Sequence, residues 1–262
     1  MANYDFSDLK DKVVIIVGGF GLIGKEISKG FISNGSQIII ASRASKDPSF
    51  LLHLQSLGRG KIDYFPFDIS KEKDTDKLIE YALKKFKKID IFVNCSWPRT
   101  KDWATDVEHV PLSSVKKNLL LQLVNYYNLT QKIAMQMKKQ KSGSIINFSS
   151  IYGSVAPTFS IYEGTKMTST PVYALIKGGI NMMTKYFASY FGKYNVRVNC
   201  ISPGGVYRNE NPKFVKNYIK LTPLGRMANP DDLVMPTLLL ASEGSRYITG
   251  HNLLVDGGWT IH

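Results

Sequence analysis

Short apolar runs alternate with longer amphipathic stretches from one end of the chain to the other. The apolar runs have the length of strands and occupy residues 13–17, 37–41, 62–67, 89–93, 144–149, 196–201 and 252–255. The stretches between them place apolar residues at helical spacing and occupy residues 22–34, 72–87, 112–140, 173–194 and 230–243. Strands apolar on both faces that alternate with helices predict an α/β fold, a doubly wound parallel sheet of about seven strands with helices on both faces.

The sequence carries no repeat, low-complexity segment or linker, so we expect one domain over residues 1–262. Its longest irregular segment covers about residues 151–172. A loop of that length in a compact domain usually has a function. We therefore predict that this segment forms a substrate loop.

The composition is that of a globular chain with no membrane segment. Hydrophobic residues make up 44% of the 262 residues, and the longest aliphatic runs, such as Val13–Val17, are far shorter than the about 20 residues of a membrane helix. The first residues lack the basic and apolar regions of a signal peptide, so we expect a cytoplasmic protein without a membrane partner. Cys95 and Cys200 fit neither a disulfide framework nor a metal-ligand spacing, so we expect small core residues and no metal site.

The formal net charge of +13 raises the question of nucleic-acid binding. Lysines form runs only at residues 84–88 and 138–141, on predicted helix ends or surfaces, and no basic-aromatic stripe accompanies them. We interpret these runs as solvated faces and expect no nucleic-acid partner. The positive charge favours an anionic substrate or cofactor.

A glycine-rich turn, Val-Gly-Gly-Phe-Gly-Leu-Ile-Gly at residues 17–24, joins the first predicted strand to a helix. This is the context in which such a turn binds a dinucleotide in a Rossmann-type fold, although a tight turn without a ligand is the alternative. Gly18 would adopt a backbone conformation closed to other residues, Gly21 would let the backbone approach a pyrophosphate, and Gly24 would allow close helix packing. The free N–H groups of the helix then favour the phosphates. The same turn contributes three further cofactor-site candidates: Phe20, Leu22 and Ile23.

The second predicted strand is followed by Ser42 and Arg43, where an NAD-binding fold would place an acidic residue on the ribose 2′-OH. A guanidinium group fits a phosphate bidentately. We therefore favour NADP(H), with Arg43 on the 2′-phosphate. NAD(H) with a solvent-exposed Arg43 is the alternative.

Tyr173 and Lys177 lie four residues apart on a predicted helix, so both side chains share one face. A nearby cation favours the phenolate and lowers a tyrosine pKa toward the range that acid/base chemistry near neutral pH requires. Taken alone, the spacing is common by chance and favours a surface pair.

Together these motifs resemble the short-chain dehydrogenase/reductase family over nearly the whole chain. The resemblance implies an adenine contact at Asp68 and Ile69, a short Asn-rich signature at Asn94, a catalytic Asn at Asn118 and a catalytic serine at Ser150. It also implies a nicotinamide-side segment, and it extends to the C-terminal signatures of the classical branch at residues 223–227, 247–250 and 255–258. The nicotinamide-side candidates are Pro203, Gly204 and Val206.

The implied reaction is NAD(P)-dependent hydride transfer that interconverts a carbonyl and an alcohol. Tyr173 would exchange the proton, Ser150 would hydrogen-bond the substrate oxygen, and Lys177 would lower the tyrosine pKa and hold the nicotinamide ribose. Asn118 would anchor a water in a proton relay. Ser149 is the alternative to Ser150, which we prefer because it stands three residues before Gly153, as the family serine usually does.

The chain departs from the family pattern in three places. Val17 replaces the usual Thr, Asn94 is followed by Cys-Ser-Trp in place of Asn-Ala-Gly, and the segment between Ser150 and Tyr173 is long. The glycine spacing is that of nucleotide-sugar epimerases and dehydratases that retain NAD, so this activity is the alternative. A non-enzymatic cofactor-binding regulator is a further alternative, which the Ser, Tyr, Lys and Asn set disfavours.

Segments 97–103, 150–157 and 161–167 resemble a subgroup of the family, flagellin modification protein A. This implies a sugar-derived substrate of bacterial surface-glycan or flagellin-glycan biosynthesis. These three segments supply the substrate-binding candidates Arg99, Lys101, Tyr152 and Lys166. We expect a small, polar, anionic, sugar-like substrate, and the alternative is that these charges are solvated.

The family usually forms tetramers through two long helices and its C-terminal region. The corresponding helices here carry apolar faces, so we expect a homotetramer or homodimer. These faces contain Leu119, Leu120, Leu123, Tyr127, Met182, Met183, Phe187 and Tyr190.

Overall fold

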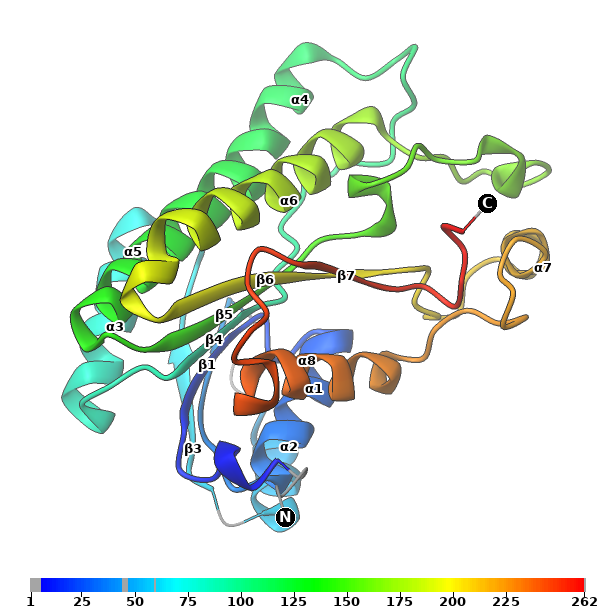
Figure 1. The fold of residues 1–262 in the computed structure, drawn as a ribbon. Coiled ribbons are helices and arrows are strands. Elements are labelled where there is room, and N and C mark those ends of the chain that lie inside the picture. Colours follow the sequence, from blue (N-terminus) through cyan, green and yellow to red (C-terminus); the bar gives the residue numbers. More distant parts are fainter. Residues whose placement is uncertain (1–5, 44–46, 59, 262) are drawn as a thin grey trace.

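The computed structural model describes residues 6–43, 47–58 and 60–261. Seven strands form one parallel sheet in the order β3-β2-β1-β4-β5-β6-β7 (Figure 1). The predicted doubly wound sheet is therefore confirmed, and its strand order reverses between β1 and β4. The strands are β1 (Val13–Val17), β2 (Gln37–Ser42), β3 (Ile62–Pro66), β4 (Ile91–Asn94), β5 (Gly143–Phe148), β6 (Val196–Pro203) and β7 (Asn252–Val255).

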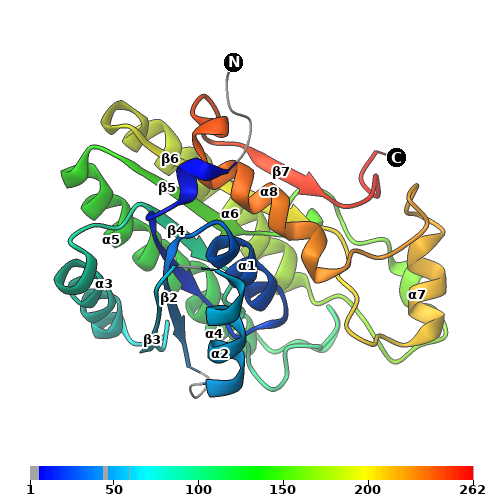
Figure 2. The same cartoon turned by 90° about the horizontal axis from the view of Figure 1, so that it is seen from below.

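Helices cover both faces of the sheet (Figures 1 and 2). The α-helices are α1 (Leu22–Ser33), α2 (Pro48–Leu57), α3 (Glu72–Phe86), α4 (Leu112–Leu119), α5 (Asn125–Gln140), α6 (Pro171–Phe191), α7 (Pro212–Ile219) and α8 (Val234–Ala241). The faces are separated by the alternation of side chains along each strand. On β1, for example, Val14 and Ile16 face α1, α2 and α8, whereas Ile15 and Val17 face α3, α5 and α6.

The stretch predicted as one helix over residues 112–140 is interrupted. A π-helical turn, Leu120–Val124, separates α4 from α5. Within it, Gln122 is 1% exposed, and its amide nitrogen has no hydrogen-bond partner among the described residues. Single π-turns of this kind often lie near functional sites.

Two helices that the apolar pattern did not predict are α2 and α7. Their starts carry capping signals: the Asp47 carboxylate accepts the Phe50 N–H at 3.0 Å, and the Asn211 side chain accepts the Lys213 N–H at 2.9 Å. Each helix has a proline at its first position.

A third, smaller apolar cluster lies outside the two sheet faces. Ile151 and Ile161 of the long loop pack there with Phe214 and Tyr218 of α7 and with Trp259 near the C-terminus. Short 3-10 helices at Ile151–Gly153 and Phe159–Tyr162 give the loop local structure. The loop is thereby held against α7 at the carboxyl end of the sheet. In the described ranges, 6–43, 47–58 and 60–261, we find no helix with the length and apolar character needed to cross a membrane.

Candidate active site

A cavity of about 1050 Å³ opens at the carboxyl ends of the central strands. Its walls come from the turn after β1, the ends of β2 and β3, and the segments after β4, β5 and β6. Ligands of open α/β sheets bind at this edge, where the strand order reverses. The cavity is lined by the predicted site residues with two exceptions, Asn94 and Asn118.

The glycine-rich turn approaches other backbone too closely to carry side chains at two positions. Gly18 has a φ of +82°, and a Cβ there would lie 3.0 Å from the Ser96 nitrogen. A Cβ on Gly24 would lie 2.2 Å from the Gly18 carbonyl oxygen, whereas one on Gly21 would meet only that oxygen, at 3.1 Å. Gly21 is also the N-cap of α1 and supplies no side-chain cap, so the first N–H groups of α1 remain available to phosphate oxygens. The turn thus fits a dinucleotide.

Arg43 and Asp68 line the same end of the cavity. The Asp68 carboxylate accepts the backbone N–H of Ser70 at 3.0 Å and its hydroxyl at 2.8 Å. Burial opposes ionisation of Asp68, but the Ser70 hydrogen bonds and the charge of Arg43 outweigh it and lower the pKa of the carboxyl. Phe20, which also lines the cavity, stacks its ring on Tyr64 with centroids 5.6 Å apart.

The two adjacent serines after β5 have different partners. The Ser149 hydroxyl donates to the Lys177 carbonyl oxygen at 3.0 Å, and so ties the strand end to α6. The Ser150 hydroxyl accepts the Tyr152 N–H at 3.3 Å, and its hydrogen bond with Tyr173 lowers the pKa of that phenol. The geometry therefore favours Ser150 as the serine that acts with Tyr173.

Tyr173 is enclosed by aromatic rings. The centroids of Trp97, Trp103 and Tyr152 lie 6.2, 5.7 and 6.3 Å from its own. Burial raises the pKa of Tyr173, against the lowering effects of the Ser150 hydrogen bond and the charge of Arg208. In the protein alone the phenol is therefore protonated at neutral pH, which is the form that donates a proton.

Lys177 is buried beneath this tyrosine. Its Nζ donates to the Phe148 carbonyl oxygen at 3.0 Å and lies 5.6 Å from the centroid of the Tyr173 ring. Burial lowers the pKa of Lys177 to about 8. The expected lowering of the tyrosine pKa by Lys177 is absent in the protein alone, where burial raises that pKa and the ammonium group of Lys177 donates to the Phe148 carbonyl oxygen.

Three residues differ in position from the expectation. The Asn118 side chain is engaged outside the cavity: it accepts the Thr100 N–H at 3.1 Å and donates to the Thr100 hydroxyl at 2.8 Å and the Ser114 carbonyl at 3.0 Å. It thus fixes the segment that carries Arg99. Asn94 is fully buried and accepts from the Ser96 hydroxyl at 2.7 Å. Cys95, expected in the core, instead lines the cavity, whereas Cys200 is buried as expected.

Cations line the end of the cavity that is formed by the segments after β4, β5 and β6. Arg99, Lys101, Lys166 and Arg208 line it there, and Glu210 is the acidic residue among them. The guanidinium carbons of Arg99 and Arg208 lie 4.3 and 5.3 Å from the Trp97 ring centroid. This end is therefore positively charged and aromatic, and Tyr152 contributes a further ring.

Sequence reasoning missed Trp103, Arg208 and Thr170, which also line the cavity. Thr170 is 4% exposed, and its hydroxyl has no hydrogen-bond partner in the described part of the chain. Arg208 did carry a signal, because it follows the predicted Pro203–Val206 segment after a strand. Trp103 and Thr170 lie in irregular segments whose course the pattern could not give.

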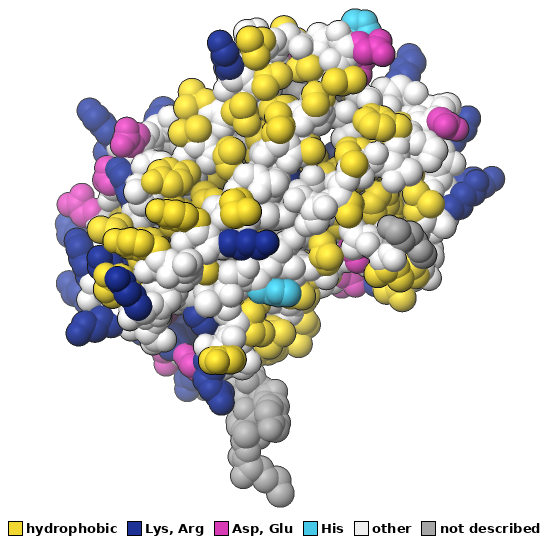
Figure 3. Space-filling view, turned by 45° about the horizontal axis from the view of Figure 1, so that its top comes forward, with side chains coloured by type: hydrophobic (Ala, Val, Ile, Leu, Met, Phe, Trp, Pro, Cys, Tyr) yellow, Lys and Arg dark blue, Asp and Glu magenta, His cyan; other side chains and the backbone are white. Residues whose placement is uncertain are grey.

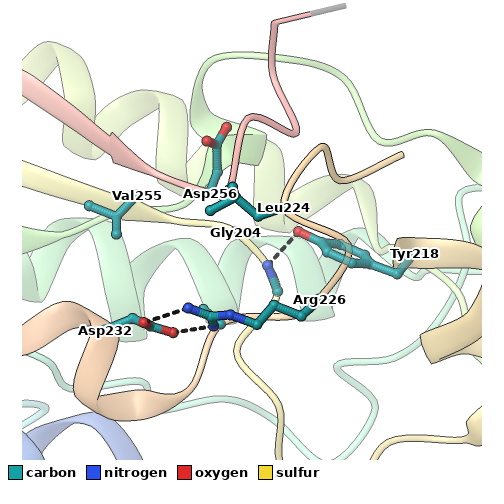
Figure 4. A pocket seen from close by; sticks show the side chains of 10 residues that line it. Gly204, Tyr218, Leu224, Arg226, Asp232, Val255 and Asp256 are labelled. Atoms are coloured by element: carbon teal, nitrogen blue, oxygen red, sulfur yellow. Dashed lines mark hydrogen bonds and ion pairs between the residues drawn. The ribbon is translucent and has the colours of Figure 1, made fainter. Parts of the chain in front are cut away.

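The predicted nicotinamide-side segment is supported from behind by α7 (Figure 4). The Tyr218 hydroxyl accepts the Gly205 N–H at 2.5 Å, and burial raises the pKa of this phenol to about 12. Next to it lies a small cavity of about 140 Å³, where Arg226 pairs with Asp232 through two hydrogen bonds of 2.5 and 2.8 Å. A Cβ on Gly204 would lie 2.9 Å from the Tyr218 oxygen, so this approach requires glycine.

Comparison of the sequence with protein-family models shows which family the chain belongs to. Residues 22–260 match the family model described as enoyl-(acyl carrier protein) reductase. The chain belongs to the short-chain dehydrogenase/reductase family. Such proteins are NAD(P)-dependent oxidoreductases that act on CH–OH groups, and this chain is one of them.

Three relatives illustrate the range of the family. The chain is 32% identical to a post-translational flagellin modification protein A from Campylobacter coli, over 97% of this chain and 100% of that protein. It is 29% identical to a 7alpha-hydroxysteroid dehydrogenase from Bacteroides fragilis, over 97% and 96% of the two chains. A crystal structure of a short-chain dehydrogenase from Leptospira borgpetersenii with bound NAD⁺ has a TM-score of 0.87 and 35% identity, over 99% of this chain and 97% of that one. The alternative of a nucleotide-sugar epimerase or dehydratase is not favoured.

Proposed function

We propose that this chain interconverts a carbonyl and an alcohol on a polar, anionic, sugar-like substrate of bacterial surface-glycan or flagellin-glycan biosynthesis. The observation that carries the proposal is the cavity itself, in which Ser150, Tyr173 and Lys177 meet under a rim rich in cations. Aromatic faces suit the C–H surface of a sugar ring, and guanidinium and ammonium groups suit a phosphate or carboxylate. The relationship to a flagellin modification protein supports the same substrate class.

The catalytic residues have distinct tasks. The nicotinamide supplies the hydride acceptor or donor when it is bound. In carbonyl reduction, Tyr173 gives its phenolic proton to the substrate oxygen, and Ser150 hydrogen-bonds that oxygen. In alcohol oxidation the phenolate of Tyr173 takes the proton from the substrate hydroxyl. The positive charge of Lys177 favours this phenolate form. The tryptophan and tyrosine rings around Tyr173 limit the access of water to this proton transfer.

Three regions would hold the cofactor. The Gly18–Gly24 turn and the start of α1 would bind the pyrophosphate. Asp68 and Ile69 would flank the adenine, and Lys177 would hold the nicotinamide ribose with the backbone of Pro203, Gly204 and Val206 beside the ring. Asn94 and Asn118 would act from behind the cavity wall, by fixing the segment after β4.

The activity test is a screen of cofactor oxidation and reduction with sugar phosphates, nucleotide sugars, sugar acids, neutral sugars and a hydroxysteroid, each with NAD and NADP. We expect turnover of an anionic sugar compound. Efficient turnover of the steroid with no activity on any anionic sugar compound would contradict the substrate class and leave the oxidoreductase assignment intact.

For the cofactor, we propose a preference for NADP(H), with Arg43 on the 2′-phosphate. Arg43 lines the cavity at the end of β2, in the position where an acidic residue would select NAD. Fluorescence titration should give a lower Kd for NADPH than for NADH, and Arg43→Asp should reverse the order. Arg246→Asp, at an exposed arginine outside the cavity, is the matched control. Equal affinities of the unaltered protein for the two cofactors would contradict the preference.

For assembly, we propose a homotetramer or homodimer that buries the outer face of α4, α5 and α6. Figure 3 shows apolar side chains gathered over this face. Leu120, Tyr127, Met182 and Tyr190 are 45–64% exposed there, whereas Met183 and Phe187, also predicted for the interface, are buried in the core. Light scattering should give a multiple of the 29.4 kDa chain mass. A monomer mass at micromolar concentration would contradict the proposal.

A further inference from the structure

Two arginines from distant parts of the chain converge on one tryptophan at the mouth of the cavity. Arg99 follows β4 and Arg208 follows β6, and their guanidinium carbons lie 4.3 and 5.3 Å from the ring centroid of Trp97. The centroid of the Trp97 ring lies 6.2 Å from that of Tyr173, so the two arginines lie near the proposed reacting centre.

Arg208 is held in place by the carboxylate of Glu210, both of whose oxygens bind it. Glu210 accepts the Arg208 backbone N–H at 2.7 Å through one oxygen and the Arg208 Nε at 2.9 Å through the other. The Glu210 side chain is only 9% exposed, whereas that of Arg208 is 51% exposed. The two terminal Nη groups of Arg208 have no acceptor within the described ranges, so they remain available to a ligand.

Arg99 has no carboxylate partner in the part of the chain that the structure describes. Partial desolvation, and then repulsion from Arg208, lower the pKa of Arg99. The fold therefore brings two like charges together on one ring, and the nearby carboxylate of Glu210 is bound to Arg208. An arrangement of this kind is stabilised by an anion that contacts both guanidinium groups.

We propose that Arg99 and Arg208 together bind an oxyanion substituent of the substrate, a carboxylate or a phosphate, on the Trp97 platform, and that Glu210 is a positioning residue for Arg208. The inference rests on the proposed function and makes these two arginines the determinants of substrate specificity. A planar guanidinium binds such groups bidentately, whereas the flexible Lys101 and Lys166 supply point charges at the rim.

The anion site can be tested by binding, without turnover. Tryptophan fluorescence of the full chain, saturated with oxidised cofactor so that the pyrophosphate site is filled, is titrated with glucuronate, glucose 6-phosphate and glucose at constant ionic strength. We expect at least one charged probe to bind more tightly than glucose by about tenfold or more, the usual effect of a charge-assisted contact. Tighter binding of glucuronate assigns a carboxylate, and tighter binding of glucose 6-phosphate assigns a phosphate.

The variants decide which residues are responsible. Arg99→Ala and Arg208→Ala should each weaken binding of the charged probe by about tenfold or more and leave the affinity for glucose unchanged. Glu210→Gln should give a smaller loss of affinity for the charged probe. Arg246→Ala is the matched control. Circular dichroism checks folding, and Arg208→Gln replaces the alanine variant if that one unfolds.

Equal binding of charged and neutral probes, or charged-probe affinity that is unchanged in both arginine variants, would overturn the proposal. Its failure is distinguishable from that of the proposed reaction. Arginine-dependent binding without any hydride transfer in the screen would refute the reaction and retain the anion site. If a sugar compound is turned over and its turnover is unchanged in both arginine variants, the proposed reaction is retained and the anion site is refuted.

Discussion

Lys177 gives a prediction whose magnitude follows from its burial. The side chain is 5% exposed, and burial lowers the pKa of its ammonium group from 10.5 to about 8. The folded protein therefore binds this proton more weakly than the unfolded chain does. A difference of about 2.5 pKa units corresponds to about 3 kcal/mol of destabilisation below pH 8, where the lysine is charged in both states.

The sign of the pH dependence follows directly. Between the folded pKa and the unfolded pKa, the unfolded chain holds more protons, so the free energy of unfolding rises with pH. For these two pKa values, about 1 kcal/mol is regained between pH 7 and pH 9. Lys177→Met keeps the length of the side chain and removes the titrating group. The free energy of unfolding of the unaltered protein minus that of Lys177→Met should therefore increase by about 1 kcal/mol over this range.

Urea unfolding of the cofactor-free proteins at pH 7 and pH 9 measures this difference. Comparing the two proteins cancels the effects of other titrating groups. Lys185→Met, at an exposed lysine of the same helix, is the control and should show no such change. A difference that stays constant or shrinks from pH 7 to pH 9 would refute the argument that Lys177 is charged and desolvated in the folded protein.

Two further substitutions test the glycine turn and the choice of serine. Gly24→Ala should weaken cofactor binding and lower the free energy of unfolding by about 1–3 kcal/mol, because its Cβ would overlap the Gly18 carbonyl oxygen at 2.2 Å. Gly192→Ala, where a Cβ meets nothing within 4 Å, should cost no stability, and an equal loss in both variants would contradict the steric argument. Ser150→Ala should reduce kcat by about a hundredfold with folding intact. Ser149→Ala should chiefly lower the melting temperature, because it removes the hydrogen bond to the Lys177 carbonyl oxygen. A large loss of kcat in Ser149→Ala, with only a lower melting temperature in Ser150→Ala, would make Ser149 the catalytic serine.

The centre of the sheet was predictable because β1, β2, β4, β5 and β6 are largely apolar runs that are buried on both faces, whereas the edge strands β3 and β7 are only partly buried. The helices α2 and α7 were missed, since each buries only two side chains in an i, i+4 pair, namely Phe50 with Leu54 and Phe214 with Tyr218. Two residues do not establish a helical period. Their capping residues were the remaining local signal.

The candidate site was predictable where its residues lie next to strand ends or share a helix face, as Ser150, Tyr173 and Lys177 do. The orientation of side chains was not. Asn118 lies on a helix beside the site, yet its amide bonds to Thr100, a contact between residues 18 positions apart that no periodicity encodes. The meeting of Arg99 and Arg208 depends on the neighbouring positions of β4, β5 and β6 in the sheet, and so on the tertiary fold.

The most direct test of the account is the activity of Tyr173→Phe, assayed with a compound that the unaltered enzyme turns over in the screen. The substitution removes the proton donor and keeps the ring between Trp97, Trp103 and Tyr152. We expect kcat to fall by about a hundredfold or more, the contribution of a positioned general acid, while the Kd for the cofactor is unchanged. Near-normal kcat in this variant would contradict the assignment of Tyr173 as the residue that exchanges the proton.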